Sequence, residues 1–121
     1  LLLGDKDRSI YYFNEALRID TITLNKDNLN ILYDYNNLGS YYKTFEEYEL
    51  ALDYLNKGIA RINSGHAETA VAKRLRFHKA STLWRMGNKK EAKPLFKELE
   101  AEARANNNQQ LLDEIKAEKR S

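Results

Sequence analysis

The chain has 121 residues, of which 42% are hydrophobic, and its formal net charge is +2. This length suits a single domain that buries a core by stacking helices. The sequence contains no cysteine and no apolar run near the roughly 18 residues of a membrane-spanning helix, which excludes disulfides, thiolate metal sites and membrane insertion. It also lacks an initial Met and a signal peptide, so we expect a piece of a longer protein, and we favour a cytoplasmic location.

Apolar side chains recur at helical spacing along most of the chain, and turn-forming residues interrupt them. The pattern predicts six helices, at about 6–24, 28–44, 47–63, 67–86, 89–106 and 109–120. Turns are expected between them at residues 25–27, 44–45, 64–65, 87–88 and 106–108, and a further turn at Gly4 and Asp5. The predicted fold class is therefore all-α.

Three places in these helices pair a small residue with a large apolar one four positions later. They are Ser9 with Phe13, Ala51 with Leu55, and Ala92 with Phe96, so the small residues are 42 and 41 positions apart. In the preceding helix 28–44, one face carries two large side chains, then a glycine, then another large side chain. These are Tyr35, Leu38, Gly39 and Tyr42. We expect a neighbouring helix to crowd this face at the point where Gly39 admits it.

Together these residues resemble the tetratricopeptide repeat, whose pattern is W-x2-L-G-x2-Y, then A-x3-F, then P. The middle unit carries it with Tyr35 at the Trp position and Asn63 where Pro is usual. The third unit departs from it, because Arg76 and Lys79 stand where the family has Trp and Leu. The interval exceeds the usual 34 residues and is similar to the longer repeats of kinesin light chains and bacterial peptide-sensing regulators.

The resemblance implies a right-handed solenoid of antiparallel helix pairs that forms a single domain of residues 1–121. Residues 1–24 would be a half repeat, 28–65 and 67–106 complete repeats, and 109–121 a capping helix or the start of a further repeat. Because the half repeat lacks its own first helix, we expect Ile10, Phe13 and Leu17 to be left without a partner and to allow self-association.

In such a solenoid the first helix of each repeat lines the concave face, where a ligand binds. The inner positions of the first complete repeat hold Tyr33, Asn36, Asn37, Ser40, Lys43 and Thr44, and those of the second hold Arg74, Phe77, His78, Ser81, Trp84 and Arg85. The resemblance implies a noncatalytic protein-interaction module for a peptide or partner helix. The candidate binding residues are Asn36, Asn37, Ser40, Arg74, His78, Ser81 and Arg85.

Asn37 is the first candidate, because an amide both donates and accepts hydrogen bonds and can hold a peptide backbone. In related repeats an Asn at this position contacts bound peptide. Asn36 and Asn37 cannot point the same way on one helix, so at most one of them is central. The alternative is that both bridge adjacent helices or face water.

Charge is distributed unevenly, since residues 1–72 contain 7 basic and 11 acidic residues, whereas residues 73–121 contain 13 and 7. In the basic half, intervals of four, three and four place four polar side chains on one helical face, those of Arg74, His78, Ser81 and Arg85. Such a row suits an acidic or C-terminal peptide. It partly resembles the carboxylate clamp of chaperone-binding members, with His78 where an Arg is usual. The alternative is a solvated basic face.

Nucleic acid is a rival ligand class, because basic residues crowd positions 73–93 and two aromatic residues interleave, Phe77 and Trp84. Against it, glutamates follow closely at positions 91, 98, 100 and 102, and the net charge is small. Trp84 could cover a ligand side chain, but a core position between helices 67–86 and 89–106 is favoured.

Catalytic patterns are weak throughout the sequence. There is no Gly-rich phosphate loop or nucleophile elbow, and the two histidines, His66 and His78, lie on different segments. We therefore expect no enzyme, no cofactor and no metal site. The alternative to a general interaction module is a sensory or regulatory segment of a bacterial signalling protein, with its output domain elsewhere.

Overall fold

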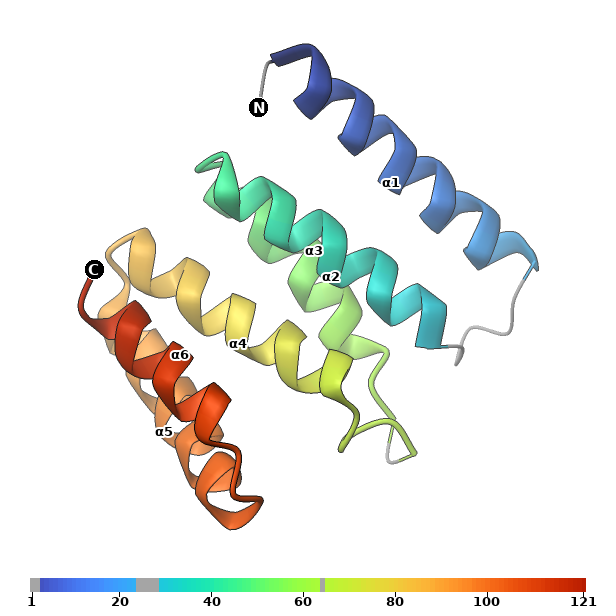
Figure 1. Ribbon diagram of the computed structural model, residues 1–121. Helices are drawn as coiled ribbons and strands as arrows, with labels where there is room; N and C mark the ends of the chain where they lie inside the picture. Colours follow the sequence, from blue (N-terminus) through green and yellow to red (C-terminus); the bar gives the residue numbers. More distant parts are fainter. Residues whose placement is uncertain (1–2, 24–28, 64) are drawn as a thin grey trace.

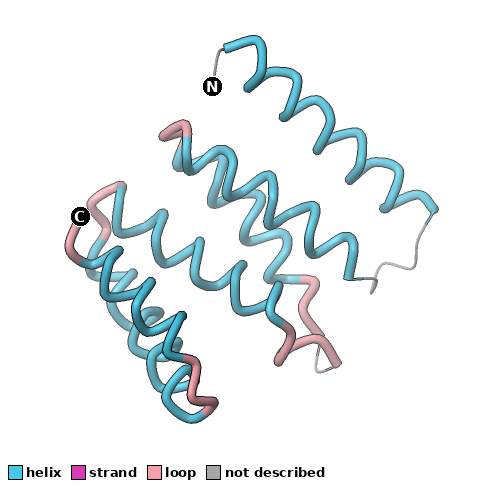
Figure 2. The backbone as a smooth tube through the Cα atoms, viewed as in Figure 1, coloured by secondary structure: helices cyan, strands magenta, loops and turns pink. Residues whose placement is uncertain are grey.

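The computed structural model describes residues 3–23, 29–63 and 65–121, and every regular element in these ranges is a helix. The helices are α1 (Leu3–Thr23), α2 (Leu29–Thr44), α3 (Tyr48–Ala60), α4 (Ala70–Arg85), α5 (Lys89–Ala105) and α6 (Gln109–Lys119). Short loops join α2 to α3, α4 to α5 and α5 to α6 (Figure 2). The all-α prediction is confirmed. Within these ranges, no helix is both long and apolar enough to cross a membrane.

The helices pack in adjacent antiparallel pairs (Figure 1). Helix α2 packs on α3 and α4 packs on α5, while α6 contacts both α5 and α4. Helix α2 also contacts α4, and α1 packs on α2. In Figure 1, α2 lies in front of α3 and α6 lies in front of α5, so that α2, α4 and α6 follow one another in a row. This row is called the α2–α4–α6 face below.

Helix starts follow the capping chemistry of the sequence. The side chain of Thr69 accepts a hydrogen bond from the backbone N–H of Ala72 (3.3 Å), which fixes the start of α4 at Ala70 rather than near residue 67. Asn88 and Asn108 cap α5 and α6 in the same way. Gly87 has a φ of 90°, a conformation that glycine adopts without strain. The turns expected at 87–88 and 106–108 are confirmed.

Two further predicted boundaries are wrong. The turn expected at Gly4 and Asp5 is helical, because α1 already begins at Leu3 and Asp5 is an acidic residue in its first turn, where the helix dipole favours it. Helix 47–63 ends at Ala60, since the N–H groups of Arg61 and Ile62 donate to carbonyls three residues earlier, which closes the last turn. The turn predicted at 25–27 lies outside the described residues, as do residues 1–2 and 64.

The repeat residues of α2 and α3 pack as their pattern predicts. The side chains of Leu38, Ala51 and Leu55 are fully buried, and Tyr35 is nearly so. A Cβ atom at Gly39 would collide with Cγ and Cδ2 of Leu55, so only glycine allows the two helices to approach at this point. The expectation of a crowded helix face at Gly39 is confirmed.

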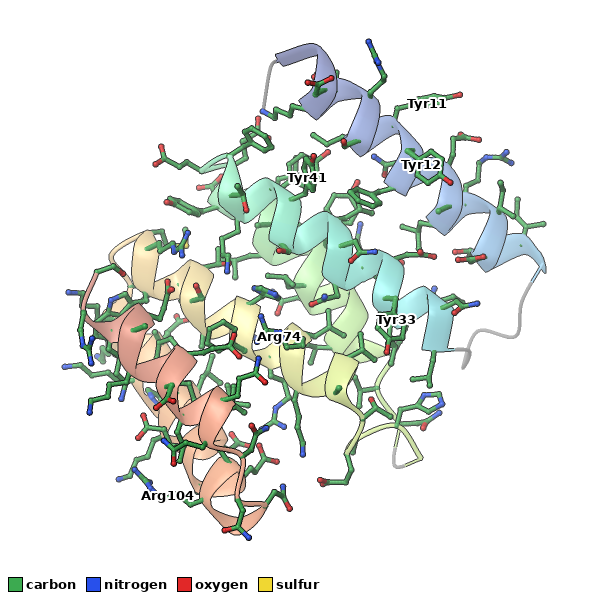
Figure 3. All side chains as sticks on the ribbon, viewed as in Figure 1. Tyr11, Tyr12, Tyr33, Tyr41, Arg74 and Arg104 are labelled. Atoms are coloured by element: carbon green, nitrogen blue, oxygen red, sulfur yellow. The ribbon has the colours of Figure 1, made fainter. Side chains whose placement is uncertain are left out.

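Helix α1 docks through the residues that were expected to lack a partner. Ile10, Phe13 and Leu17 pack against the buried cluster of α2 and α3, so that expectation is wrong. Phe13 meets Tyr41 edge to face at 5.3 Å between ring centroids. The apolar residues that stay exposed lie on the other faces of α1, where Figure 3 shows Tyr11 on the side away from α2. They are Tyr11, Tyr12, Ile19 and Ile22.

Candidate functional site

The seven candidate residues lie on two neighbouring helices of the α2–α4–α6 face. Asn36, Asn37 and Ser40 belong to α2, and Arg74, His78, Ser81 and Arg85 belong to α4. Their exposure differs sharply, because Asn37 and Arg85 are exposed whereas His78 and Ser81 are buried. The α4 residues meet carboxylates of α6, which were not among the candidates.

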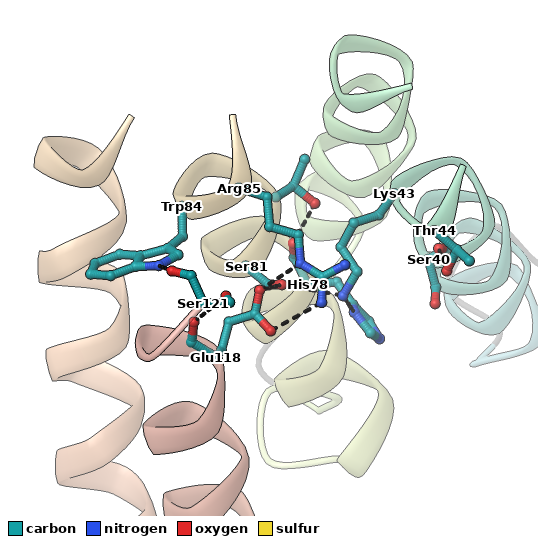
Figure 4. Close-up of polar contacts among 10 residues, drawn as sticks. Ser40, Lys43, Thr44, His78, Ser81, Trp84, Arg85, Glu118 and Ser121 are labelled. Carbon is teal, nitrogen blue, oxygen red and sulfur yellow. Dashed lines mark hydrogen bonds and ion pairs between the residues drawn. The ribbon is translucent and has the colours of Figure 1, made fainter. Parts of the chain in front are cut away.

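Two arginines of α4 pair with two glutamates of α6. Arg74 Nη1 donates to Glu114 Oε2 at 2.6 Å. Arg85 forms a bidentate pair with Glu118, through Nε at 2.7 Å and Nη2 at 3.1 Å (Figure 4). Glu114 and Glu118 are four residues apart and therefore share one face of α6, turned toward α4. The basic row is thus already matched by acidic residues of the same chain.

Glu118 joins the arginine pair to the middle of α4. Its Oε1 accepts a hydrogen bond from the Ser81 hydroxyl at 2.6 Å, in addition to the bond from Arg85 Nε. Burial raises the pKa of this carboxyl, but the hydrogen bonds from Arg85 and Ser81 outweigh burial, and the pKa is lowered. Glu118 is therefore a stable anion between α4 and α6.

Lys43 extends from the end of α2 into the same network. Its Nζ lies 2.8 Å from His78 Nδ1 and 3.3 Å from Ser81 Oγ, and only 6% of the residue is exposed. Burial, followed by the charges of Lys43 and Arg74, lowers the pKa of His78 to about 3, so the imidazole is neutral and its Nδ1 accepts from the ammonium. Burial and then the charge of Arg85 lower the pKa of Lys43 to about 8.

A hollow of about 430 Å³ opens beside these groups, between α2, α4 and α6. Its polar lining consists of Lys43, Arg74, His78, Arg85, Glu114, Glu118 and Ser121, and Phe77 and Ala117 contribute apolar surface. The hollow is open to solvent, and charged side chains dominate its lining. The arrangement suits noncovalent recognition of a polar group.

Comparison with protein families agrees with the helix pairs and their spacing. The tetratricopeptide repeat family matches residues 1–64 and again residues 74–106. The chain belongs to the tetratricopeptide repeat family. No curated protein and no solved structure matches it. Tetratricopeptide repeats are generally protein–protein interaction modules.

The departure of the third unit from the tetratricopeptide pattern has a local explanation. Arg76, at the position where the family has Trp, forms ion pairs from α4 to Glu98 (3.2 Å) and Glu102 (2.6 Å) of α5. A charged bridge, with the stem of Arg76 half-buried, thus replaces an aromatic contact between the two helices. The helix pair is retained because Ala92 and Phe96 still fill the core below it.

The two amides of α2 point in different directions, as expected for adjacent residues on a tetratricopeptide helix. Asn36 is half-buried, and its Oδ1 has no hydrogen-bond partner among the described residues. Asn37 is exposed, and its side chain makes no hydrogen bond to another described residue. Ser40 is half-exposed one turn further along the helix, and its carbonyl accepts from the Thr44 hydroxyl.

The aromatic residues of α4 belong to the core. Phe77 and Trp84 are both buried and pack edge to face against Phe96 of α5, at 6.3 and 5.9 Å between ring centroids. The core position favoured for Trp84 is confirmed. Buried rings cannot offer the stacking platform that single-stranded nucleic acid uses, which weighs against that ligand class.

Sequence reasoning missed three residues of this network. Glu114 and Glu118 were placed only in a capping helix or the start of a further repeat, although their spacing of four puts two carboxylates on one helix face. Lys43 was placed on the inner face without a role. No local signal indicated its burial, because burial depends on how α4 packs against the end of α2.

Proposed function

We propose that this chain is a noncatalytic interaction module that binds an extended peptide or a partner helix along the α2–α4–α6 face. The observation that supports this most is Asn37, which is exposed and makes no hydrogen bond to another described residue. An amide in this state is free to donate to and accept from a peptide backbone. The nearby hollow offers space for a side chain of the same ligand.

The arginines of α4 retain donors for a ligand despite their ion pairs. A guanidinium has five N–H donors. Glutamates of α6 engage one donor of Arg74 and two of Arg85. We propose that Asn37, Ser40, Arg74 and Arg85 contact the ligand directly, with Asn36 beside them. His78 and Ser81 are buried and would not touch the ligand. They would act indirectly, by holding Lys43 and Glu118 in place.

The repeat organisation is part of the proposal. We infer a half repeat at residues 1–24, complete repeats at 28–65 and 67–106, and a cap or further repeat at 109–121. The longer variety of tetratricopeptide repeat, of about 42 residues, is supported by the 41-residue interval between Ala51 and Ala92, both fully buried.

Selection from a library of random peptides tests the proposed function. The chain is used as bait, and the affinity of each selected peptide is then measured for two matched variants, Asn37→Ala on α2 and Asn56→Ala, an exposed amide on α3. We expect the first variant to weaken binding at least about tenfold, which corresponds to about 1.4 kcal/mol, and the second to leave it unchanged. Equal affinities for both variants would place binding elsewhere and overturn the proposal.

A sensory or regulatory segment of a bacterial signalling protein is the second candidate. The long repeat interval favours it, together with a composition rich in Asn, Lys and Tyr. In that case the ligand is a small peptide and the output lies in a kinase or DNA-binding domain of the same protein. Sequencing the complete reading frame that encodes this chain tests this candidate. A kinase or DNA-binding domain in the same frame would support it, and a frame without either would overturn it.

Self-association is a third part of the partner proposal, and we place it on the outer stripe of α1, defined as Tyr11, Glu15, Arg18 and Ile22. Tyr11 and Ile22 are each 69% exposed, and Glu15 and Arg18 form an exposed ion pair of 3.1 Å. In an antiparallel pair of α1 helices with the two-fold axis between residues 15 and 18, Tyr11 would face Ile22 and Glu15 would face Arg18 of the second copy. The stripe is therefore complementary to itself.

A further inference from the structure

The side chain of Lys43 is buried between α2 and α4 without a carboxylate in contact. Only 6% of the residue is exposed, and no ion pair joins its ammonium to a carboxylate among the described residues. Its two hydrogen-bond partners, the His78 imidazole and the Ser81 hydroxyl, are both neutral (Figure 4). Neutral partners replace the hydration of an ammonium only in part. The fold therefore disfavours the charged form of Lys43.

The charges around Lys43 act in the same direction as its burial. Arg85 and Arg74 of α4 repel the ammonium, whereas Glu118 and Glu114 of α6 attract it. Each arginine has a larger effect than the glutamate with which it pairs, and burial has the largest effect, so the pKa of Lys43 falls to about 8. About a tenth of the side chain is then the free amine at neutral pH, which is roughly 300 times the fraction for a lysine of pKa 10.5.

A free lysine amine is a nucleophile, and Lys43 lies where a small molecule can reach it. Its side chain lines the hollow of about 430 Å³ between α2, α4 and α6, which is open to solvent. Desolvation and a neighbouring cation both activate a lysine as a nucleophile, because both favour the neutral amine. Since so little of Lys43 is exposed, this position favours a small electrophile over a bulky one.

We propose that Lys43 is a site of reversible modification by carbon dioxide, in which its amine forms a carbamate. The lone pair of Nζ attacks the carbon atom, a C–N bond forms, and the electron pair of one C=O bond moves to its oxygen. One N–H proton leaves to solvent water, so that the products are a carbamate anion and a hydrated proton. The inference goes beyond the proposed function, because it concerns a covalent change of the chain itself.

The surroundings of Lys43 suit the carbamate as well as the amine. A carbamate nitrogen keeps one hydrogen, which can still donate to His78 Nδ1, the closer of the two partners at 2.8 Å. The contact with Ser81 that would be lost is long, at 3.3 Å. The added carboxylate group would occupy the hollow, and the charges of Arg74 and Arg85 that disfavour the ammonium favour an anion there. Modification would thus change the local charge from positive to negative.

Trapping of the carbamate on the wild-type chain locates the site. The chain is equilibrated with carbon dioxide and bicarbonate at pH 7.5, carbamates are ethylated with triethyloxonium ion, and the labelled lysines are identified by mass spectrometry of peptides. Lys90, an exposed lysine of α5, is the internal reference. We expect at least about tenfold more label at Lys43, because its larger fraction of free amine outweighs its lower basicity. Labelling of Lys43 equal to or below that of Lys90 would overturn the proposal.

The same labelling in guanidinium chloride tests whether the fold causes the reactivity. Unfolding removes the burial of Lys43 and the charges around it, so its labelling should fall to that of Lys90. Labelling of Lys43 that stayed high in the unfolded chain would contradict a site made by the fold.

Two matched variants give an independent readout. With isotope-labelled carbon dioxide, the wild-type chain should show a carbamate carbon signal by nuclear magnetic resonance. We expect Lys43→Met to lose this signal and Lys90→Met to retain it. If both variants retained the signal, the carbamate would lie elsewhere, such as at the N-terminal amine, and the proposal would fail. The trapping experiment decides the case in which Lys43→Met does not fold, because it uses the wild-type chain.

Discussion

Two buried ionisable residues of α2 face opposite neighbours. Lys43 extends toward α4, whereas Asp34 lies against Asp20 of α1. Asp34 is 9% exposed, and its Oδ2 has no hydrogen-bond partner among the described residues. Burial, followed by the hydrogen bond and charge of Asp20, raises the pKa of Asp34 to about 7. The α1–α2 contact therefore contains a carboxyl group that is easier to bury protonated than charged.

The raised pKa of Asp34 makes the stability of the chain depend on pH. Because the folded-state value of about 7 exceeds the ordinary 3.8, the folded chain binds more protons than the unfolded chain between these two values. The contribution of Asp34 is fully present below about pH 4 and is lost as the pH rises toward 7. We expect Asp34→Asn to raise the free energy of unfolding at pH 7.5 by roughly 2 kcal/mol and to change it little at pH 4.

Urea unfolding at a series of pH values measures this effect. Asp53→Asn, at an exposed position of α3, is the control and should follow the wild-type profile. Parallel pH profiles for wild type and Asp34→Asn would show that Asp34 does not govern the pH dependence.

Close approach at Gly39 gives a second prediction at the scale of one residue. A Cβ atom there would collide with the fully buried side chain of Leu55. The gain in helix propensity from glycine to alanine is about 1 kcal/mol, and overpacking costs about 1–3 kcal/mol. We expect Gly39→Ala to be net destabilising by up to about 2 kcal/mol in urea unfolding, whereas Gly65→Ala, in an exposed turn, should change stability by less than about 0.5 kcal/mol. A stabilised Gly39→Ala would refute the steric argument.

At the scale of elements, α6 is an integral part of the fold rather than a loose tail. Leu111 and Ile115 are buried in the same cluster as Phe96 and Leu99 of α5, while Glu114 and Glu118 pair with α4. Apolar burial supplies most of the attachment, because ion pairs that are partly exposed contribute about 0–1 kcal/mol each. Any ligand on the α2–α4–α6 face must therefore bind beside α6 and not replace it.

This attachment is tested by Ile115→Ala. Removing a fully buried isoleucine side chain costs about 2–4 kcal/mol, and we expect that loss in the free energy of global unfolding. Lys116→Ala, on the exposed side of the same helix, should cost less than about 0.5 kcal/mol. If Ile115→Ala lost hydrogen-exchange protection in α6 alone and left global stability unchanged, α6 would be an independently fraying unit.

The elements also show what the sequence could and could not predict. The α2–α3 pair was predictable because Gly39, Ala51 and Leu55 follow a local repeat pattern that encodes which face meets which. Glu118 was not, because its role depends on the register between α4 and α6, and helical periodicity contains no information about that register. For α1, the sequence showed an apolar face but not which helices cover it. The analogy with the repeat family predicted that Ile10, Phe13 and Leu17 would lack a partner, whereas they pack against α2 and α3.

At the scale of the whole molecule, the two ends of the helix array differ in character. The exposed positions of α6 are mainly polar, as in Gln109, Gln110 and Asp113. The opposite end exposes Tyr11, Tyr12, Ile19 and Ile22 on α1. Apolar surface of this extent at one end of an array favours contact with another helix. Self-association should therefore proceed through α1 and leave the α2–α4–α6 face accessible.

Charge reversal on α1 tests this directly by sedimentation equilibrium. In the proposed antiparallel pair, Arg18→Glu would place a glutamate against Glu15 of the second copy, and we expect the dimer dissociation constant to rise at least about tenfold. The double variant Glu15→Arg and Arg18→Glu restores opposite charges in the same geometry and should recover the dimer, although it keeps neither original side chain. Equal weakening by the single and double variants would contradict the antiparallel register. A wild-type chain that stays monomeric at every concentration would contradict the interface itself.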